Sequence, residues 1–194
     1  MSDDGYTRYR LTVEQYYRMA DIGVLAPDAR TELIEGEIYD MAPIGSRHAG
    51  TVQWLHMQLS RAVGDLALVF TQSPARLSRI TEPQPDLLVL RPRDDHYRDA
   101  HPTAKDILLL IEVSDSTVRY DCEIKVPLYA SYGVLETWVV DLNARQLICH
   151  RSPHSGSYLE TTLVNTPGTI ALASMERISV DLTRLFAFGN QSVS

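Results

Sequence analysis

Three charged residues lie in or beside apolar segments, and the apolar pattern of those segments gives no reason for a charge at these positions. Asp86 opens one apolar run, and Glu112 lies near the end of the next run, which spans residues 106–113. Lys125 follows in an amphipathic segment. Ionised groups beside buried strands cost free energy unless they are paired, hydrogen-bonded or bound to a metal. These three residues are therefore the first candidates for chemistry.

The two acids would meet if their apolar runs were neighbouring antiparallel strands, because the start of one strand then lies beside the end of the other. Two adjacent carboxylates repel each other, and a divalent cation relieves that repulsion. Oxygen ligands suit Mg²⁺ or Mn²⁺ better than zinc, and the sequence has no cysteine–histidine cluster with zinc spacing. On this interpretation Asp86 and Glu112 are metal ligands.

Lys125 would complete such a site. A lysine beside metal-bound acids can position or deprotonate a nucleophilic water and can offset the charge that develops on a phosphate. The alternative interpretation is structural: Asp86 caps a turn, Glu112 pairs with a surface arginine and Lys125 is solvated. Spacing alone leaves both interpretations open.

The elements that position these residues can be predicted from the pattern around them. The helix that carries Lys125 is expected to begin at about residue 123, because Pro127 is tolerated only near a helix start. Gly133 is its expected C-terminal stop. Lys125 would then lie in the first turn, where backbone N–H groups also favour an anion.

The N-terminal part predicts a helix and a hairpin. Thr12 and Gln15 fit a capping box that opens a helix to about Ala20. Residues 30–41 read as a hairpin in which Gly36 supplies an unusual backbone angle. The three glutamates of this hairpin either form a solvated face, or one of them points into the site as an additional acid.

A long helix is expected over residues 47–63, with Ser46 as its N-cap and a stripe of apolar residues on one face. His48 falls in its first turn, as a structural hydrogen-bonding residue or as part of the site. Further strands are predicted at residues 66–70, 74–78, 86–90, 106–113, 137–141, 146–150, 158–164 and 169–172, with a closing helix at residues 182–188. The apolar run at residues 106–113 predicts a central, buried strand.

No internal repeat or linker interrupts the chain, so we expect residues 1–194 to form one α/β domain with a mixed sheet. Its 44% hydrophobic residues can fill a substantial core. No window approaches the roughly 18 consecutive apolar residues of a membrane span, and the start of the chain lacks the features of a secretory signal. Two cysteines without an export signal favour free thiols and a cytoplasmic location.

The net charge of −7 lowers the expectation of a nucleic-acid partner, because such proteins usually carry a basic footprint. A basic patch can nevertheless be local. Several arginines cluster around the strand that Asp86 opens, and they form either such a patch or a solvated loop: Arg76, Arg79, Arg91, Arg93 and Arg98.

Several segments taken together resemble the Uma-type family of restriction endonucleases, which belongs to the PD-(D/E)XK nuclease superfamily. They are residues 32–37, 47–48, 85–86, 111–117, 120–129 and 133–141. The resemblance covers about residues 11–185. It implies an α/β, restriction-endonuclease-like mixed β-sheet flanked by helices and Mg²⁺-dependent hydrolysis of phosphodiester bonds, with Mn²⁺ as an alternative metal. The implied partner is nucleic acid, with DNA as the expected substrate.

The resemblance also implies an active-site set, namely Asp86, Glu112 and Lys125, with the two acids as metal ligands. The lysine of the superfamily usually lies two residues after the glutamate, where this chain has Ser114, and Lys125 matches the lysine that takes over in this family. Cys122 and Thr137 also depart from the family pattern. Three further residues carry over in supporting roles: Glu32 as an outer acid, His48 as a phosphate- or water-orienting group and Tyr129 as a partner of Lys125.

Two other functions stay open at this point. A nuclease-fold protein that has lost cleavage would bind nucleic acid or a protein partner instead. A structural or assembly subunit would need no nucleic acid, which would agree with the acidic charge. Superfamily members often dimerise, so a homodimer is also open, although the sequence does not indicate an interface.

Overall fold

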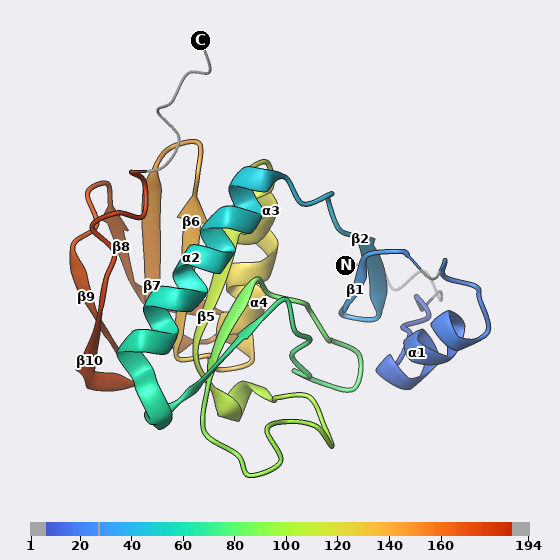
Figure 1. The fold of residues 1–194 in the computed structure, drawn as a ribbon. Helices are drawn as coiled ribbons and strands as arrows, with labels where there is room; N and C mark the ends of the chain where they lie inside the picture. Colours follow the sequence, from blue (N-terminus) through green and yellow to red (C-terminus); the bar gives the residue numbers. More distant parts are fainter. Residues whose placement is uncertain (1–6, 27, 188–194) are drawn as a thin grey trace.

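The computed structural model describes residues 7–26 and 28–187, which are built around a six-stranded mixed sheet (Figure 1). The strand order is β3-β4-β5-β6-β7-β8, and only β5 and β6 run parallel. The strands are β3 Leu68–Thr71, β4 Leu87–Leu90, β5 Ile107–Ser114, β6 Glu136–Asp141, β7 Gln146–His154 and β8 Ser157–Val164. The predicted fold class, an α/β mixed sheet flanked by helices, is confirmed.

The sheet is covered on both faces. Helix α2 (Ser46–Val63) crosses one face (Figure 1), where its buried Val52, Leu55 and Leu59 pack in the larger core cluster. A helical segment at residues 118–131 contributes Tyr129 to the core on the other side, together with Leu88 and Leu110. A separate pair of strands, β9 (Thr169–Leu172) and β10 (Met175–Asp181), adds Leu172 and Val180 to the cluster that contains α2.

The N-terminal residues form a smaller unit beside the sheet (Figure 1), with helix α1 (Val13–Asp21) and the hairpin of β1 (Thr31–Ile34) and β2 (Glu37–Asp40). The predicted capping box of Thr12 and Gln15 is present. Gly36 has a φ of +78°, and a Cβ built on it would lie 2.8 Å from the Cα of Arg10. Both facts require glycine at this turn.

The register of β4 and β5 is the feature that assembles the candidate site. The strands are antiparallel, with Leu87 opposite Ile111. Asp86 immediately precedes β4, and Glu112 immediately follows Ile111 in β5. The two acidic residues are therefore neighbours where β4 begins and β5 ends, as the pattern predicted. All eight residues of β5 are buried, which confirms its central position.

The helix that carries Lys125 begins earlier than predicted. It runs through α3 (Val118–Tyr120), a π-helical turn η3 (Asp121–Lys125) and α4 (Val126–Ser131). The prediction placed its start at residue 123 because Pro127 cannot donate to a carbonyl one turn back. The wider turn before Pro127 accommodates it within a longer helical segment. Lys125 is therefore not in a first turn, and the expected helix-start N–H groups do not surround it. Gly133 ends the segment with a φ of +77°, as predicted.

Several smaller predictions were wrong. Gly45, not Ser46, is the N-cap of α2, and it provides no side-chain cap. Residues 74–78 form no strand, since Ala75 and Arg76 donate their backbone N–H groups to the loop carbonyls of Pro83 and Pro102. Residues 183–187 form turns instead of a helix, and residue 188 of that prediction lies outside the described residues.

The remaining elements include two short 3-10 turns and one strand that was not predicted. The chain forms 3-10 turns at η1 (Gly64–Leu66) and η2 (Ala104–Asp106), and strand β10 was missed. Cys122 and Cys149 are free thiols, as expected. Within the described part of the chain, none of the helices is long and apolar enough to cross a membrane.

Candidate active site

A cavity of about 420 Å³ opens at the meeting point of four parts of the chain. They are the hairpin, the start of α2, the ends of β4 and β5 that carry Asp86 and Glu112, and the helical segment at residues 118–131. Asp86, Glu112 and Lys125 all line it, together with Glu32 and His48. A larger cavity of about 530 Å³ lies elsewhere, between α2 and the turn after β6, and no acidic side chain lines it. The acid-lined cavity is therefore the candidate site.

Asp86 is held by two donors on one of its oxygens. Its Oδ2 accepts the backbone N–H of Val113 at 2.8 Å and lies 3.0 Å from Nε2 of His48. The other oxygen, Oδ1, has no hydrogen-bond partner among the described residues. Asp86 is thus fixed in orientation and keeps one oxygen for a ligand.

Glu112 repeats this arrangement in a more buried position. Its Oε1 accepts hydrogen bonds from Nζ of Lys125 at 3.1 Å and from the hydroxyl of Tyr129 at 2.5 Å. Its Oε2 has no hydrogen-bond partner within the described ranges. Burial raises the pKa of Glu112 to about 8, and the charges of Asp121, Asp86 and Glu32 add to the rise while Lys125 opposes it. The carboxyl group therefore gains strongly from any additional cation.

Lys125 is the buried cation of the site, with 4% of its surface exposed. Its Nζ lies 3.1 Å from both Oε2 of Glu32 and Oε1 of Glu112. Burial lowers the pKa of Lys125, but the charges of Glu112, Glu32 and Asp121 outweigh burial and raise it. Lys125 is therefore an ammonium at neutral pH, and its three N–H groups leave at least one donor beyond its two carboxylate partners.

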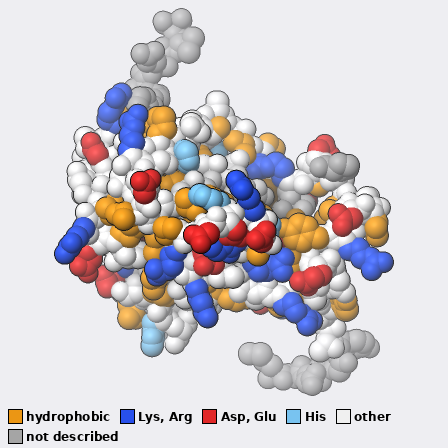
Figure 2. All heavy atoms as spheres, turned by 60° about the horizontal axis from the view of Figure 1, so that its bottom comes forward, with side chains coloured by type: hydrophobic (Ala, Val, Ile, Leu, Met, Phe, Trp, Pro, Cys, Tyr) orange, Lys and Arg blue, Asp and Glu red, His pale blue; other side chains and the backbone are white. Residues whose placement is uncertain are grey.

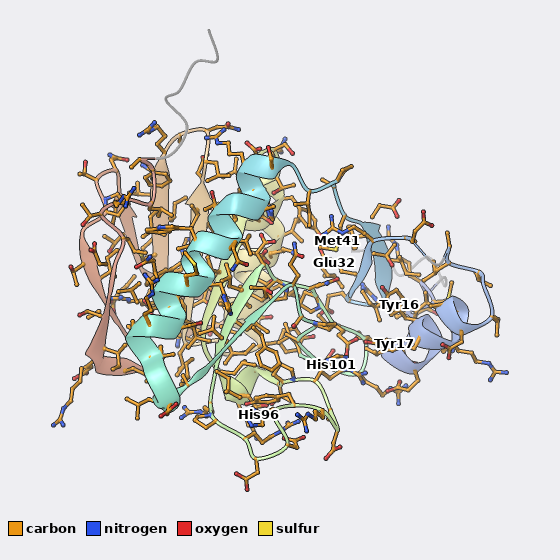
Figure 3. All side chains as sticks on the ribbon, viewed as in Figure 1. Tyr16, Tyr17, Glu32, Met41, His96 and His101 are labelled. Atoms are coloured by element: carbon orange, nitrogen blue, oxygen red, sulfur yellow. The ribbon has the colours of Figure 1, made fainter. Side chains whose placement is uncertain are left out.

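Glu32 is the hairpin glutamate that lines the cavity, and Figure 3 labels it beside the hairpin of β1 and β2. Besides its ion pair with Lys125, it accepts the backbone N–H of Gln84 at 3.1 Å and the hydroxyl of Tyr120 at 3.2 Å. The other two hairpin glutamates have different partners, since Glu35 accepts the hydroxyl of Tyr132 and Glu37 pairs with Arg8. The structure thus resolves the question that the three glutamates left open.

His48 is the other supporting residue that the cavity brings to Asp86. Burial lowers its pKa, but the hydrogen bond and the charge of Asp86 outweigh burial and raise it. Its Nδ1 is buried and has no hydrogen-bond partner within the described part of the chain. His48 is thus arranged to orient Asp86.

One buried acid of the site was not predicted. Asp121 accepts the hydroxyls of Ser114 and Thr117, each at 2.7 Å, and its charge helps to raise the pKa of Lys125. Through its hydrogen bond to Asp121, Ser114 connects the end of β5 to η3. Spacing along the sequence gave no signal for Asp121, because the hydroxyls that hold it come together only in the folded chain.

The donor set fits a hard cation held by few protein ligands. Oδ1 of Asp86 and Oε2 of Glu112 are the carboxylate oxygens of the central pair without a partner. Within residues 7–26 and 28–187, no three or more acidic, histidine or cysteine side chains are arranged to share one ion. Mg²⁺ is commonly held by one or two carboxylates, with waters and substrate phosphates completing its coordination. Asp86 and Glu112 therefore suit Mg²⁺ or Mn²⁺ as the two protein ligands.

Two of the five arginines around strand β4 form ion pairs with acidic side chains. Arg76 pairs with Glu82 and Glu14, and Arg93 pairs with Asp95. Figure 2 shows basic and acidic side chains interspersed over the face that it presents. The charges of Arg76 and Arg93 are thus neutralised locally, whereas Arg79, Arg91 and Arg98 form no ion pair within the described residues.

Most of the chain matches the model of a known protein family. Residues 13–183 match the model of the Uma2 family, described as "Putative restriction endonuclease". A solved structure of a "putative nuclease belonging to DUF820" from Anabaena variabilis is similar in fold, with a TM-score of 0.68 and 14% sequence identity. The similarity covers 91% of this chain and 98% of that one. No functionally curated protein matches the chain.

Proposed function

We propose, from the premise that the chain belongs to the Uma2 family of restriction endonucleases, that this protein is a metal-dependent endonuclease that hydrolyses phosphodiester bonds of DNA. One observation carries the proposal. Asp86 and Glu112 both line one open cavity, each has one carboxylate oxygen without a hydrogen-bond partner among the described residues, and the buried ammonium of Lys125 contacts Glu112.

The metal that this proposal requires is Mg²⁺ or Mn²⁺, held by Asp86 and Glu112. When bound, it would supply Lewis-acid stabilisation of the negative charge on the phosphate. The remaining steps fall to side chains. His48 and the backbone of Val113 fix Asp86, and Lys125 and Tyr129 fix Glu112.

Lys125 is proposed to orient the attacking water and to offset charge on the phosphate. Its raised pKa makes it a donor at neutral pH, so it does not remove a proton from the water. Glu32 and Glu112 both hold the ammonium, with one carboxylate oxygen of each 3.1 Å from Nζ. A cation fixed between two carboxylates needs little reorganisation when a phosphate arrives.

The proposal is tested by incubating the protein with duplex DNA, single-stranded DNA and RNA in Mg²⁺ or Mn²⁺, beside Asp86→Ala and Glu112→Ala. We expect metal-dependent cleavage of DNA that both substitutions abolish, and no cleavage in EDTA. Cleavage that persists in both variants would refute the assigned site.

Cleavage of RNA alone would correct the substrate. Retained binding of nucleic acid without cleavage of any substrate would favour a catalytically silent nuclease fold. Absence of both binding and cleavage would favour a structural role.

A further inference from the structure

The two edges of the six-stranded sheet differ in length and exposure. Strand β3 forms one edge with four residues, three of them partly buried. Strand β8 forms the other edge with eight residues, most of them exposed. Leu159 and Leu163 of β8 are 69% and 60% exposed. A long edge strand with exposed leucines is an open template for another strand.

The outer backbone groups of β8 are also unpaired. Its ladder partner is β7, and no other backbone–backbone hydrogen bond from β8 exists within the described residues. Proteins usually protect such an edge with lysine, proline or a covering segment. Strand β8 contains neither lysine nor proline.

We propose that β8 pairs antiparallel with β8 of a second copy of this chain, with the two-fold axis at Thr161. The order of its residues is self-complementary in this register. Leu159 lies opposite Leu163 of the second copy, Glu160 lies opposite Thr162, and Thr161 meets itself. The paired strands would join two six-stranded sheets into one continuous sheet with an isologous contact.

The charge of Glu160 excludes the register centred on residue 160, and the two leucines favour the one centred on Thr161. If the axis passed through residue 160, the two copies of Glu160 would lie directly opposite each other, and like charges in that position destabilise a strand pair. Centring on Thr161 removes this repulsion and creates two apolar leucine pairs. The symmetric placing of the exposed Leu159 and Leu163 about Thr161 is the feature that favours a second copy of this chain as the occupant. The inference is independent of the proposed nuclease function.

The test compares two neighbouring lysine substitutions. Thr161→Lys would place two ammonium groups opposite each other at the axis, whereas Thr162→Lys would place each ammonium opposite Glu160 of the other copy. We expect wild type to be a dimer by sedimentation velocity, Thr161→Lys to weaken the dimer about tenfold, and Thr162→Lys to leave it intact or strengthen it. Circular dichroism checks that both variants are folded.

Cysteine substitutions test the register separately. Thr161→Cys is expected to form a disulfide-linked dimer under mild oxidation, because the two Cα atoms would lie within the roughly 7 Å that a disulfide allows. Thr162→Cys is expected not to cross-link, since its two copies are offset along the strands. A monomeric wild type would overturn the proposal. So would a dimer that Thr161→Lys and Thr162→Lys affect equally, or one that Thr161→Cys fails to cross-link.

Discussion

Two buried glutamates, Glu112 on β5 and Glu136 on β6, show what separates a structural acid from a candidate catalytic one. Both are almost fully buried on neighbouring strands of the same sheet. Oε1 of Glu136 accepts Nε1 of Trp138 at 2.9 Å and pairs with Arg151 at 2.7 Å, and its Oε2 accepts the backbone N–H of Ala173 at 2.7 Å. Both oxygens of Glu136 are satisfied.

Glu112 differs in the number of charges around it and in its free oxygen. It shares Lys125 with Glu32, and the charges of Asp121 and Asp86 help to raise its pKa. Several acids thus surround one cation, and Oε2 of Glu112 faces no donor in the described part of the chain. Burial of a glutamate alone therefore does not indicate a functional site. A buried acid that shares one cation with other acids and lines an open cavity is the better indicator of such a site.

The largest expected effect separates the two glutamates by activity. Glu112→Gln is expected to reduce metal-dependent cleavage at least about a thousandfold, because it removes one of the two proposed metal ligands. Glu136→Gln should leave the rate per folded molecule within about threefold. Initial rates of plasmid cleavage measure both. Equal losses in the two variants would remove the distinction between them.

The second effect separates them by stability. Glu136→Gln leaves Arg151 without its charged partner, and we expect it to lower the free energy of unfolding by about 2–3 kcal/mol. The matched control is Glu160→Gln on the exposed edge strand, which should change the free energy by less than about 0.5 kcal/mol. Urea denaturation followed by circular dichroism measures both values. A Glu136→Gln variant as stable as the control would contradict the structural role.

The third effect concerns pH. The pKa of Glu112 is raised to about 8 from the ordinary 4.5, so its contribution to stability is fully present below the ordinary value and is lost as the pH rises through about 8. Below that pH the folded protein holds a proton that a metal must displace. We expect Mn²⁺ affinity to rise by up to about tenfold per pH unit toward pH 8 and then to level off.

Titration calorimetry at a series of pH values measures this dependence. Glu136→Gln serves as the control, because it should show the same pH profile as wild type. An affinity that does not change with pH would show that Glu112 holds no proton in competition with the metal.

The smallest effect concerns the hydroxyl that orients Glu112. Tyr129→Phe removes the donor to Oε1, and we expect cleavage to fall about fivefold. Tyr158→Phe is the matched control, since its hydroxyl donates to the carbonyl of Val134. Steady-state cleavage kinetics should show the loss for Tyr129→Phe alone. Equal rates for the two variants would show that Tyr129 does not orient the site.

The parts of the fold that sequence could predict are those with local signals. The apolar run of residues 106–113 identified the central strand, and the capping box identified α1. The pairing of Asp86 with Glu112 followed from one assumption of antiparallel neighbours, which the register confirmed. Lys125 was a candidate from its amphipathic segment, and the family resemblance then favoured it over a solvated lysine, because a lysine 13 residues beyond Glu112 has no recognisable spacing of its own.

The parts that could not be predicted depend on long-range contacts. The exposed residues of β10 gain their strand conformation by pairing with β9. The early helix start depends on η3, whose wider turn tolerates Pro127. Asp121 became visible as a member of the site only when Ser114 and Thr117 were brought to it. In each case the sequence near the residue favoured a different local structure or none.

The most direct test of the central claim is Mn²⁺ binding by titration calorimetry in wild type, Glu112→Gln and Glu136→Gln. Wild type and Glu136→Gln are expected to bind Mn²⁺ with the same affinity, because Glu136 is already satisfied by Trp138, Arg151 and Ala173. Glu112→Gln is expected to lose at least about tenfold in affinity. Unchanged Mn²⁺ binding by Glu112→Gln would contradict the assignment of this corner as a metal site.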